Sequence, residues 1–268
     1  MDGDALAWLR HAAVGWATAI GRPLADLLLP RACVLCARLM DPAERDLCCG
    51  ACWLAAQELP RPRCGRCGHP CAIEVTLPRP AERPCQWCAL LPPYVRAVRS
   101  AYALPGGTAG RVVHALKYGG WPAVARGMGR RMAALRFPPD VEVERAGLVP
   151  VPLAPSRRRE RGYNQSAELA RAVGACWGLP VLDNLLVRTR ATRTQTRLTP
   201  GERHRNVSGA FHASAERATL RGLHLVLVDD VITTGATLNA CAAALHDGGA
   251  RILSYVTFGR APAVGDRW

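Results

Sequence analysis

The sequence predicts an α/β protein in which a doubly wound, mostly parallel sheet follows a small cysteine-rich domain. Short apolar runs typical of buried parallel strands alternate with helical segments in the second part of the chain. Ten of the twelve cysteines lie between residues 33 and 88. We therefore divide the chain into an N-terminal amphipathic helix at residues 1–30, a cysteine-rich domain at 31–92 and an α/β domain at 93–268.

The charge of the chain is unusual, because the formal net charge is +14 over 268 residues and Lys117 is the single lysine. Such an excess predicts polyanionic partners, either nucleic acid or phosphorylated metabolites. No segment approaches the roughly 20 apolar residues that a membrane-spanning helix needs. Asp2 and Asp4 precede the first basic residue, so we expect no secretory signal and a cytoplasmic protein.

Apolar residues recur at helical spacing near the N-terminus. They are Trp8, Leu9, Ala12, Ala13, Trp16 and Ile20. A helix of this kind docks on a membrane surface or a partner, or packs against its own protein, and we expect the packed arrangement.

Four C-x2-C pairs dominate the cysteine-rich domain. Each pair places two thiolates on one side of a turn, and two pairs complete a tetrahedral zinc site. We predict two structural zinc sites, with the ligands Cys33, Cys36, Cys49 and Cys52 in the first, and Cys64, Cys67, Cys85 and Cys88 in the second. A cross-braced pairing of the first pair with the third stays open, whereas a disulfide framework needs an oxidising compartment.

Three more side chains of this domain, Cys48, Cys71 and His69, are spare and can replace a neighbouring ligand. Little else in the domain forms a core, so we expect zinc to supply its folding free energy. Cys176 and Cys241 lie in helical segments and are expected to be buried thiols. The arginines of the domain form either a nucleic-acid surface or a solvated face; they are Arg61, Arg63, Arg66, Arg79 and Arg83.

The α/β domain alternates between the two periodicities. Strands are expected at Val95–Leu104, Leu148–Pro152, Val181–Val187, Leu225–Val228 and Arg251–Thr257. Helices are expected from Thr108 to about Lys117, from Pro122 to Leu135, from a start within Ser156–Ser166 to Trp177, and from Ala236 to Leu245.

A basic loop follows the expected strand at Leu148–Pro152 and opens a helix. Arginines next to a glycine at such a junction can clamp a pyrophosphate by bidentate hydrogen bonds, and the alternative is a solvated basic loop. The candidate residues are Arg157, Arg158, Arg161 and Gly162. Lys117 stands beside a double glycine and either contacts a ligand phosphate or pairs with the negative end of a helix dipole.

Residues 188–205 contain six arginines and almost no apolar side chain. A loop of this length without its own structure is often a lid. We interpret it as a mobile hood, including Gln195 and Arg203, that excludes water from a reactive sugar.

The strand at Leu225–Val228 runs into two adjacent acids, Asp229 and Asp230, and a turn of small residues then opens a helix. Free N–H groups and the helix dipole at such a start favour a bound anion. The expected phosphate contacts are Thr233, Thr234, Gly235, Ala236 and Thr237. The acids repel the same phosphate, so they suit ribose hydroxyls, directly or through Mg2+.

This stretch resembles the phosphoribosyl pyrophosphate (PRPP) signature of type I phosphoribosyltransferases. The resemblance implies a sheet of that type, with PRPP and Mg2+ at residues 229–237 and the two acids as catalytic residues. The order of motifs is similar to that of the ComF family, which pairs a zinc ribbon with such a domain. After the zinc knuckles these motifs are Leu116–Tyr118, Pro150–Pro152, Arg161–Gln165, Gln195, Asn206–Phe211 and Asp229–Thr237.

The family resemblance implies a role in natural competence or DNA utilisation, with incoming single-stranded DNA and competence or recombination proteins as partners. Under this hypothesis PRPP is a bound ligand. The alternative is a catalytically active phosphoribosyltransferase in nucleobase or nucleotide metabolism, for which the sequence shows no acceptor pocket. A transcriptional regulator on the same fold ranks last, because no helix-turn-helix candidate is present.

Overall fold

The computed structural model describes residues 31–41, 43–71, 85–104, 106–189, 209–214 and 217–262. The expected N-terminal helix and the hood residues Gln195 and Arg203 lie outside these ranges.

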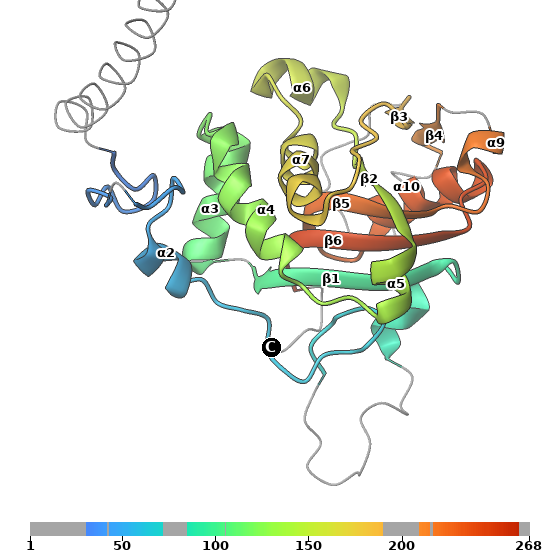
Figure 1. Cartoon of the computed structure of the whole chain (residues 1–268), viewed down its shortest axis with the longest axis horizontal. Coiled ribbons are helices and arrows are strands. Elements are labelled where there is room, and N and C mark those ends of the chain that lie inside the picture. The colour runs from blue at the N-terminus through green and yellow to red at the C-terminus, as the bar shows by residue number, and fades with distance from the viewer. Residues whose placement is uncertain are drawn as a thin grey trace, which may run out of the picture.

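Four parallel strands form the central sheet, in the order β1-β6-β5-β2 (Figure 1). They are β1 (Val95–Ala103), β6 (Ile252–Arg260), β5 (His224–Ile232) and β2 (Arg145–Pro150). In the central strand β5 only Val231 is not fully buried. Its apolar run therefore behaves as expected of a strand that is covered on both faces.

Helices cover both faces of the sheet, which confirms the doubly wound arrangement. On one face α3 (Gly107–Tyr118), α4 (Ala125–Ala133) and α7 (Gln165–Trp177) share a core with the strands. On the opposite face α10 (Ala236–Asp247) packs on β5 and β6 (Figure 1). The chain thus places the start of α10 directly after the carboxyl end of β5.

The remaining elements are short. They are α2 (Gly50–Leu54), η1 (Gln86–Leu90), η2 (Pro122–Val124), α5 (Pro139–Glu144), α6 (Pro155–Arg161), β3 (Leu186–Arg188), β4 (Phe211–Ala213) and α9 (Arg217–Leu220).

Two expectations about elements were wrong in detail. The strand expected at Val181–Val187 is divided: Val181 forms only a single parallel bridge to Leu148 of β2, and β3 pairs antiparallel with β4. Strand β5 does not stop before the acids but continues through them to Ile232. The helix expected to end at Trp177 begins at Gln165, within the expected range, and a separate short helix, α6, precedes it and ends at Gly162, whose φ of 84° is left-handed.

The cysteine-rich segment covers the free edge of strand β1. The N–H of Val98 donates to the carbonyl of Arg66 (2.8 Å), and the N–H of Ala103 donates to the carbonyl of Gln57 (2.9 Å). An open strand edge exposes unpaired backbone groups that invite association. The segment therefore provides hydrogen-bond partners for backbone groups at this edge of the sheet, in addition to any role in binding metal.

The first half of this segment also enters the core that α3, α4 and α7 cover. Trp53 stacks with Tyr102 of β1 (ring centroids 6.5 Å apart) and meets the edge of Phe258 of β6 (6.2 Å). The guanidinium of Arg131 lies 3.6 Å from the Trp53 ring centroid. The expectation that zinc alone supplies the folding free energy of this segment therefore needs a correction, because its apolar side chains also pack into the core of the α/β domain.

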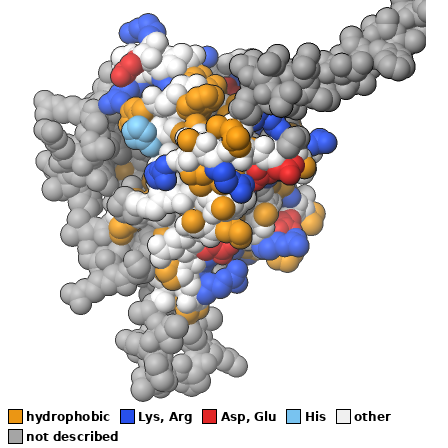
Figure 2. All heavy atoms as spheres, turned by 90° about the vertical axis from the view of Figure 1, so that its left-hand side faces the viewer, with side chains coloured by type: hydrophobic (Ala, Val, Ile, Leu, Met, Phe, Trp, Pro, Cys, Tyr) orange, Lys and Arg blue, Asp and Glu red, His pale blue; other side chains and the backbone are white. Residues whose placement is uncertain are grey.

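The outer face of this first half stays partly apolar. Leu39 and Leu54 are 65% and 90% exposed. Figure 2 views the side of the molecule where α2 and α3 lie, and shows apolar side chains there interspersed with basic ones.

Candidate functional site

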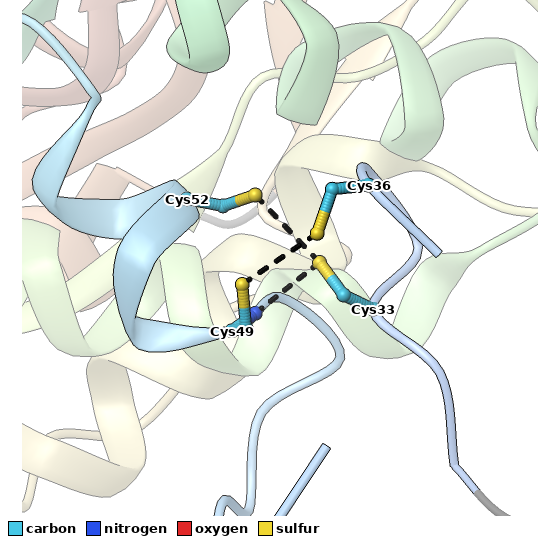
Figure 3. A group of neighbouring side chains, drawn as sticks. All are labelled: Cys33, Cys36, Cys49 and Cys52. Atoms are coloured by element: carbon cyan, nitrogen blue, oxygen red, sulfur yellow. Dashed lines mark hydrogen bonds between the residues drawn. The ribbon is translucent and has the colours of Figure 1, made fainter. Parts of the chain in front are cut away.

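The first four predicted zinc ligands come together in one cluster (Figure 3). The sulfur atoms of Cys33 and Cys52 are 3.8 Å apart, and those of Cys36 and Cys49 are 3.7 Å apart. A tetrahedron with Zn–S bonds of about 2.3 Å has an edge of roughly 3.8 Å. The four thiols are therefore spaced to hold a zinc ion.

The second cluster repeats this geometry. The sulfurs of Cys64 and Cys88, and those of Cys67 and Cys85, are each 3.5 Å apart. These separations far exceed a disulfide bond of about 2.05 Å. The two clusters pair the knuckles in sequence, as predicted, so the cross-braced alternative is excluded.

One thiol in each cluster is prepared to ionise. Burial would raise the pKa of Cys33, but backbone N–H groups, among them that of Cys49 at 3.3 Å from its sulfur, lower the pKa to about 6. Burial likewise opposes ionisation of Cys64, and N–H groups such as that of Cys67 lower its pKa to about 7. Each cluster thus offers a thiolate that can recruit a cation.

The three spare side chains lie outside both clusters. Burial, with nearby negative charge, raises the pKa of Cys48 to about 12. The Cys71 sulfur lies 3.7 Å from the carbonyl of His69, whose ring stacks on Trp87 with centroids 4.8 Å apart. Cys241 is buried as expected, whereas Cys176 is exposed and that expectation was wrong.

Two of the arginines near the second cluster are committed to the protein backbone. Arg66 donates to the carbonyls of Pro92 (2.9 Å) and Val95 (3.0 Å). Arg63 donates to the carbonyl of Pro60 (3.2 Å). These contacts favour a structural role for the two arginines over a nucleic-acid contact.

The acid pair lies at the carboxyl end of β5, with Asp229 9% and Asp230 3% exposed. The Asp229 carboxylate accepts a hydrogen bond from the Ser166 hydroxyl (2.8 Å) and another from the N–H of Asp230 (2.9 Å). Burial, together with repulsion from Asp230, raises the pKa of Asp229 to about 8. The two adjacent carboxyl groups therefore favour keeping a proton over ionising together.

Lys117, at the end of α3, forms an ion pair with the second acid. Its Nζ contacts Oδ2 of Asp230, and the two side chains are 23% and 5% exposed. Burial opposes the charge of Lys117, but Asp230 and, more weakly, Asp229 outweigh that effect and raise its pKa. The sequence had suggested a ligand phosphate or the helix dipole as the partner of Lys117, and it had not predicted this ion pair.

The predicted phosphate turn lies between the acids and α10. Gly235 has a φ of 80° and precedes the first helical residue, Ala236. Gly235 occupies the N-cap position and has no side chain with which to cap the helix. Thr233, Thr234 and Thr237 are half-buried around this turn.

The predicted pyrophosphate residues lie on α6 and at its end. Arg157 and Arg161 are half-buried, and Arg158 and Gly162 are exposed. Gly162 ends α6 in the left-handed conformation, which a side chain would strain.

The segment after Gly162 connects this loop to the acids. Asn164 caps α7 by accepting from the N–H of Ser166 (3.1 Å), and its amide donates to the carbonyl of Val151 (3.0 Å). The hydroxyl of Tyr163 donates to the carbonyl of Leu116, next to Lys117. The basic loop, the end of β2, the end of α3 and Asp229 are therefore one bonded unit.

The sequence interpretation missed Ser166 as a partner of Asp229 and Asn164 as a helix cap. Asparagine before a helical apolar pattern is a capping signal that identifies Gln165 as the helix start.

A hollow of about 780 Å³ lies between residues 89–94, β4 and α10. Of the described residues that line it, none is a predicted site residue. None of the helices in the described parts of the chain is both long and apolar enough to cross a membrane.

Two protein families match the chain: a double zinc ribbon domain over residues 24–89 and a phosphoribosyl transferase domain over residues 161–266. The DNA utilization protein YhgH of Salmonella typhimurium is 32% identical over 236 residues, which cover 84% of this chain and 94% of that protein. Competence protein F of Haemophilus influenzae is 38% identical over 92 residues, which cover 34% of this chain and 40% of that protein. Competence protein ComFC of Bacillus subtilis is 32% identical over 102 residues, 38% of this chain and 39% of that protein.

The matched ribbon includes all eight clustered cysteines, and the matched transferase domain includes the acid pair and the turn that follows it. The similarity to YhgH extends through both parts of the chain, because it covers 94% of that relative. From this shared two-part architecture we conclude that the chain belongs to the ComF family of competence and DNA utilization proteins.

Proposed function

We propose that the protein binds PRPP with Mg2+ at the turn after β5 and acts in DNA uptake or single-stranded DNA handling during natural competence. The observation that carries the proposal is the junction of a buried acid pair with the N-terminus of a helix that begins after a left-handed glycine, Gly235. Ribose hydroxyls would donate to Asp229 and Asp230, and the 5′-phosphate would accept from the turn at Thr233–Thr237. Arg157, Arg158, Arg161 and Gly162 would face the pyrophosphate, and Gln195 and Arg203 the outer side of the ligand.

The names of the relatives support the biological half of the proposal, since they are a competence protein and DNA utilization proteins. Single-stranded DNA and competence or recombination proteins are the partners we propose. Free thiols at zinc spacing support a cytoplasmic, reducing location. We also keep residues 1–30, 31–92 and 93–268 as the proposed units.

The ligand is tested by thermal unfolding with and without PRPP and Mg2+. A ligand that binds only the folded state raises Tm, because it stabilises that state by about 2.7 kcal/mol when its concentration is 100 times Kd. The double variant Asp229→Asn with Asp230→Asn should lose this shift. The matched control, Asp140→Asn with Asp183→Asn, changes two more exposed acids and should keep it. An unchanged shift in the first variant would contradict the site.

The phosphoribosyl transferase match keeps a second function in view, a catalytically active enzyme in nucleobase or nucleotide metabolism. Incubation with PRPP, Mg2+ and a panel of bases should then release pyrophosphate, and the double variant should not. Binding of PRPP without release of pyrophosphate for any base would favour the role as a bound ligand.

A further inference from the structure

We propose that Lys117 is a placeholder cation, which neutralises the acid pair in the free protein and transfers to the pyrophosphate when PRPP binds. The inference rests on the proposed PRPP site and identifies a positioning residue within it. Its basis is the ion pair between Lys117 Nζ and Asp230 Oδ2 at the end of β5.

The acid pair already has a counter-charge without a ligand. The ammonium of Lys117 contacts Oδ2 of Asp230, and the Asp230 side chain is only 5% exposed. A buried carboxylate without a counter-charge is costly. Any ligand that takes over the carboxylates as acceptors therefore has to provide for the lysine it separates from them.

The identity of the residue favours exchange over permanent pairing. The chain contains 35 cationic residues, and Lys117 is the one lysine among them. An arginine holds a carboxylate by a planar, two-pronged fork, whereas a lysine ammonium makes a point contact on a flexible stem. The position thus uses the residue that the rest of the chain avoids, and that residue is the one easier to displace.

The surroundings hold the backbone on both sides of Lys117. Tyr163 donates to the carbonyl of Leu116, and the guanidinium of Arg161 lies 5.5 Å from the ring centroid of Tyr118. Both neighbours of Lys117 are therefore held by the segment that carries the proposed pyrophosphate contacts. A pyrophosphate bound at that segment would attract an ammonium displaced from Asp230.

Because the side chain of Asp230 is only 5% exposed and its Oδ2 contacts Lys117, a ribose hydroxyl that takes this oxygen as its acceptor competes with the ammonium. A ligand with a pyrophosphate returns a partner to Lys117, and a ligand without one does not. Ribose 5-phosphate and PRPP share the sugar and the 5′-phosphate, so comparing them isolates the role of the lysine.

The first test measures the affinity of both ligands for Lys117→Met in the presence of Mg2+. We expect PRPP to bind at least about tenfold more weakly than to the unaltered protein. We expect ribose 5-phosphate to bind as tightly or more tightly, because no ion pair has to be broken. A purely structural role would weaken both ligands equally, and that result would overturn the proposal.

The second test observes Lys117 itself, the single lysine of the full chain. Reductive methylation with 13C-formaldehyde labels Lys117 and the N-terminal amine, and the Lys117→Arg chain identifies which NMR signal belongs to the lysine. PRPP with Mg2+ should shift the Lys117 signal and keep it broad, whereas ribose 5-phosphate should sharpen it. A signal that neither ligand changes would overturn the placeholder role.

The two proposals fail in different ways. If the unaltered protein shows no thermal shift with PRPP and Mg2+, the PRPP site and the placeholder role are both wrong. If it shows the shift, and Lys117→Met shows the same PRPP affinity, only the placeholder role is wrong.

Discussion

The acid pair shows how a few side chains share one charge in a buried place. Asp229 and Asp230 are adjacent, and two ionised carboxylates at this depth would repel each other. The raised pKa of Asp229, the hydrogen bond from the Ser166 hydroxyl and the contact with the Lys117 ammonium all reduce that cost. Any ligand for this site enters a charge-balanced arrangement and competes with protein groups that already use the carboxylates.

A pH dependence follows from Asp229. Its pKa in the folded protein, about 8, lies above the roughly 3.9 of an unfolded aspartate. The neutral carboxyl therefore stabilises the fold fully below about pH 4, and this contribution is lost as the pH rises toward 8. The Asp229→Asn side chain cannot lose a proton. Its free energy of unfolding relative to that of the unaltered protein should therefore increase from pH 5 to pH 8, by about 1.4 kcal/mol per pH unit at most, and its relative Tm should increase with it.

The measurement is a series of thermal melts without ligand. Asp140→Asn is the matched control, because Arg96 holds the pKa of Asp140 below its usual value and no titration of that group falls in this window. Parallel pH profiles for the Asp229→Asn chain and the unaltered chain would contradict the raised pKa.

The two cysteine clusters were predictable from sequence because the C-x2-C motif is local and its spacing is set by metal coordination. The acids and the threonines of the turn were proposed as a site from a local motif in the same way. The Ser166–Asp229 and Lys117–Asp230 contacts were not predictable, since they join residues 63 and 113 positions apart along the chain. Nothing in the local pattern of Lys117 distinguishes a lysine that faces an acid from one that faces a phosphate. The tertiary fold decides that.

The second ribbon and strand β1 show how one element completes another. Gly68 has a φ of 66°, and a Cβ built there would lie 2.5 Å from the carbonyl oxygen of Val98. The backbone of the ribbon therefore approaches the edge of β1 at a distance that only glycine allows. The close approach is what lets the carbonyl of Arg66 accept from the N–H of Val98.

Gly68→Ala should accordingly destabilise the protein by about 2 kcal/mol or more, because both the left-handed backbone and the contact are lost. Gly65→Ala, in the same knuckle, meets no atom within 4 Å and should change stability by less than about 0.5 kcal/mol. Urea unfolding of both variants measures the difference. Equal stability of the two variants would mean that the ribbon does not press against β1.

The strand between Val181 and Val187 illustrates a limit of sequence interpretation at this level. The apolar pattern was present, but pairing partners divide the stretch: Val181 joins β2, and Leu186–Arg188 pairs with β4. Here tertiary pairing overrides a local period. The short helix α6 was missed for a different reason: its residues were interpreted as a basic loop, and it ends at the left-handed Gly162 before α7 begins.

The two parts of the chain share one core on the α4 and α7 side of the sheet. Trp53 packs on Tyr102 and Phe258, so the zinc-binding part contributes to the same apolar cluster as the sheet. Metal binding and sheet stability are therefore linked, because losing zinc removes support from a core that both parts use.

Metal analysis should find about two zinc ions per chain. Cys36→Ser should reduce this to about one and lower Tm in a single transition with the α/β domain. Cys176 is also exposed but belongs to neither cluster, so Cys176→Ser should retain both ions and the original Tm. A separate low-temperature transition for the ribbon would contradict the shared core.

Both acids belong to strand β5 itself, and Asp229 lies opposite Thr257 of β6, so neither acid stands on a loop. A sheet interior holds its residues more firmly than a loop does. The two carboxylates are thus the rigid part of the proposed site. Adjustment to an incoming sugar is left to the parts that surround the acids, such as the side chain of a lysine or a turn. Ligand affinity can therefore change in evolution through these parts while the sheet stays the same.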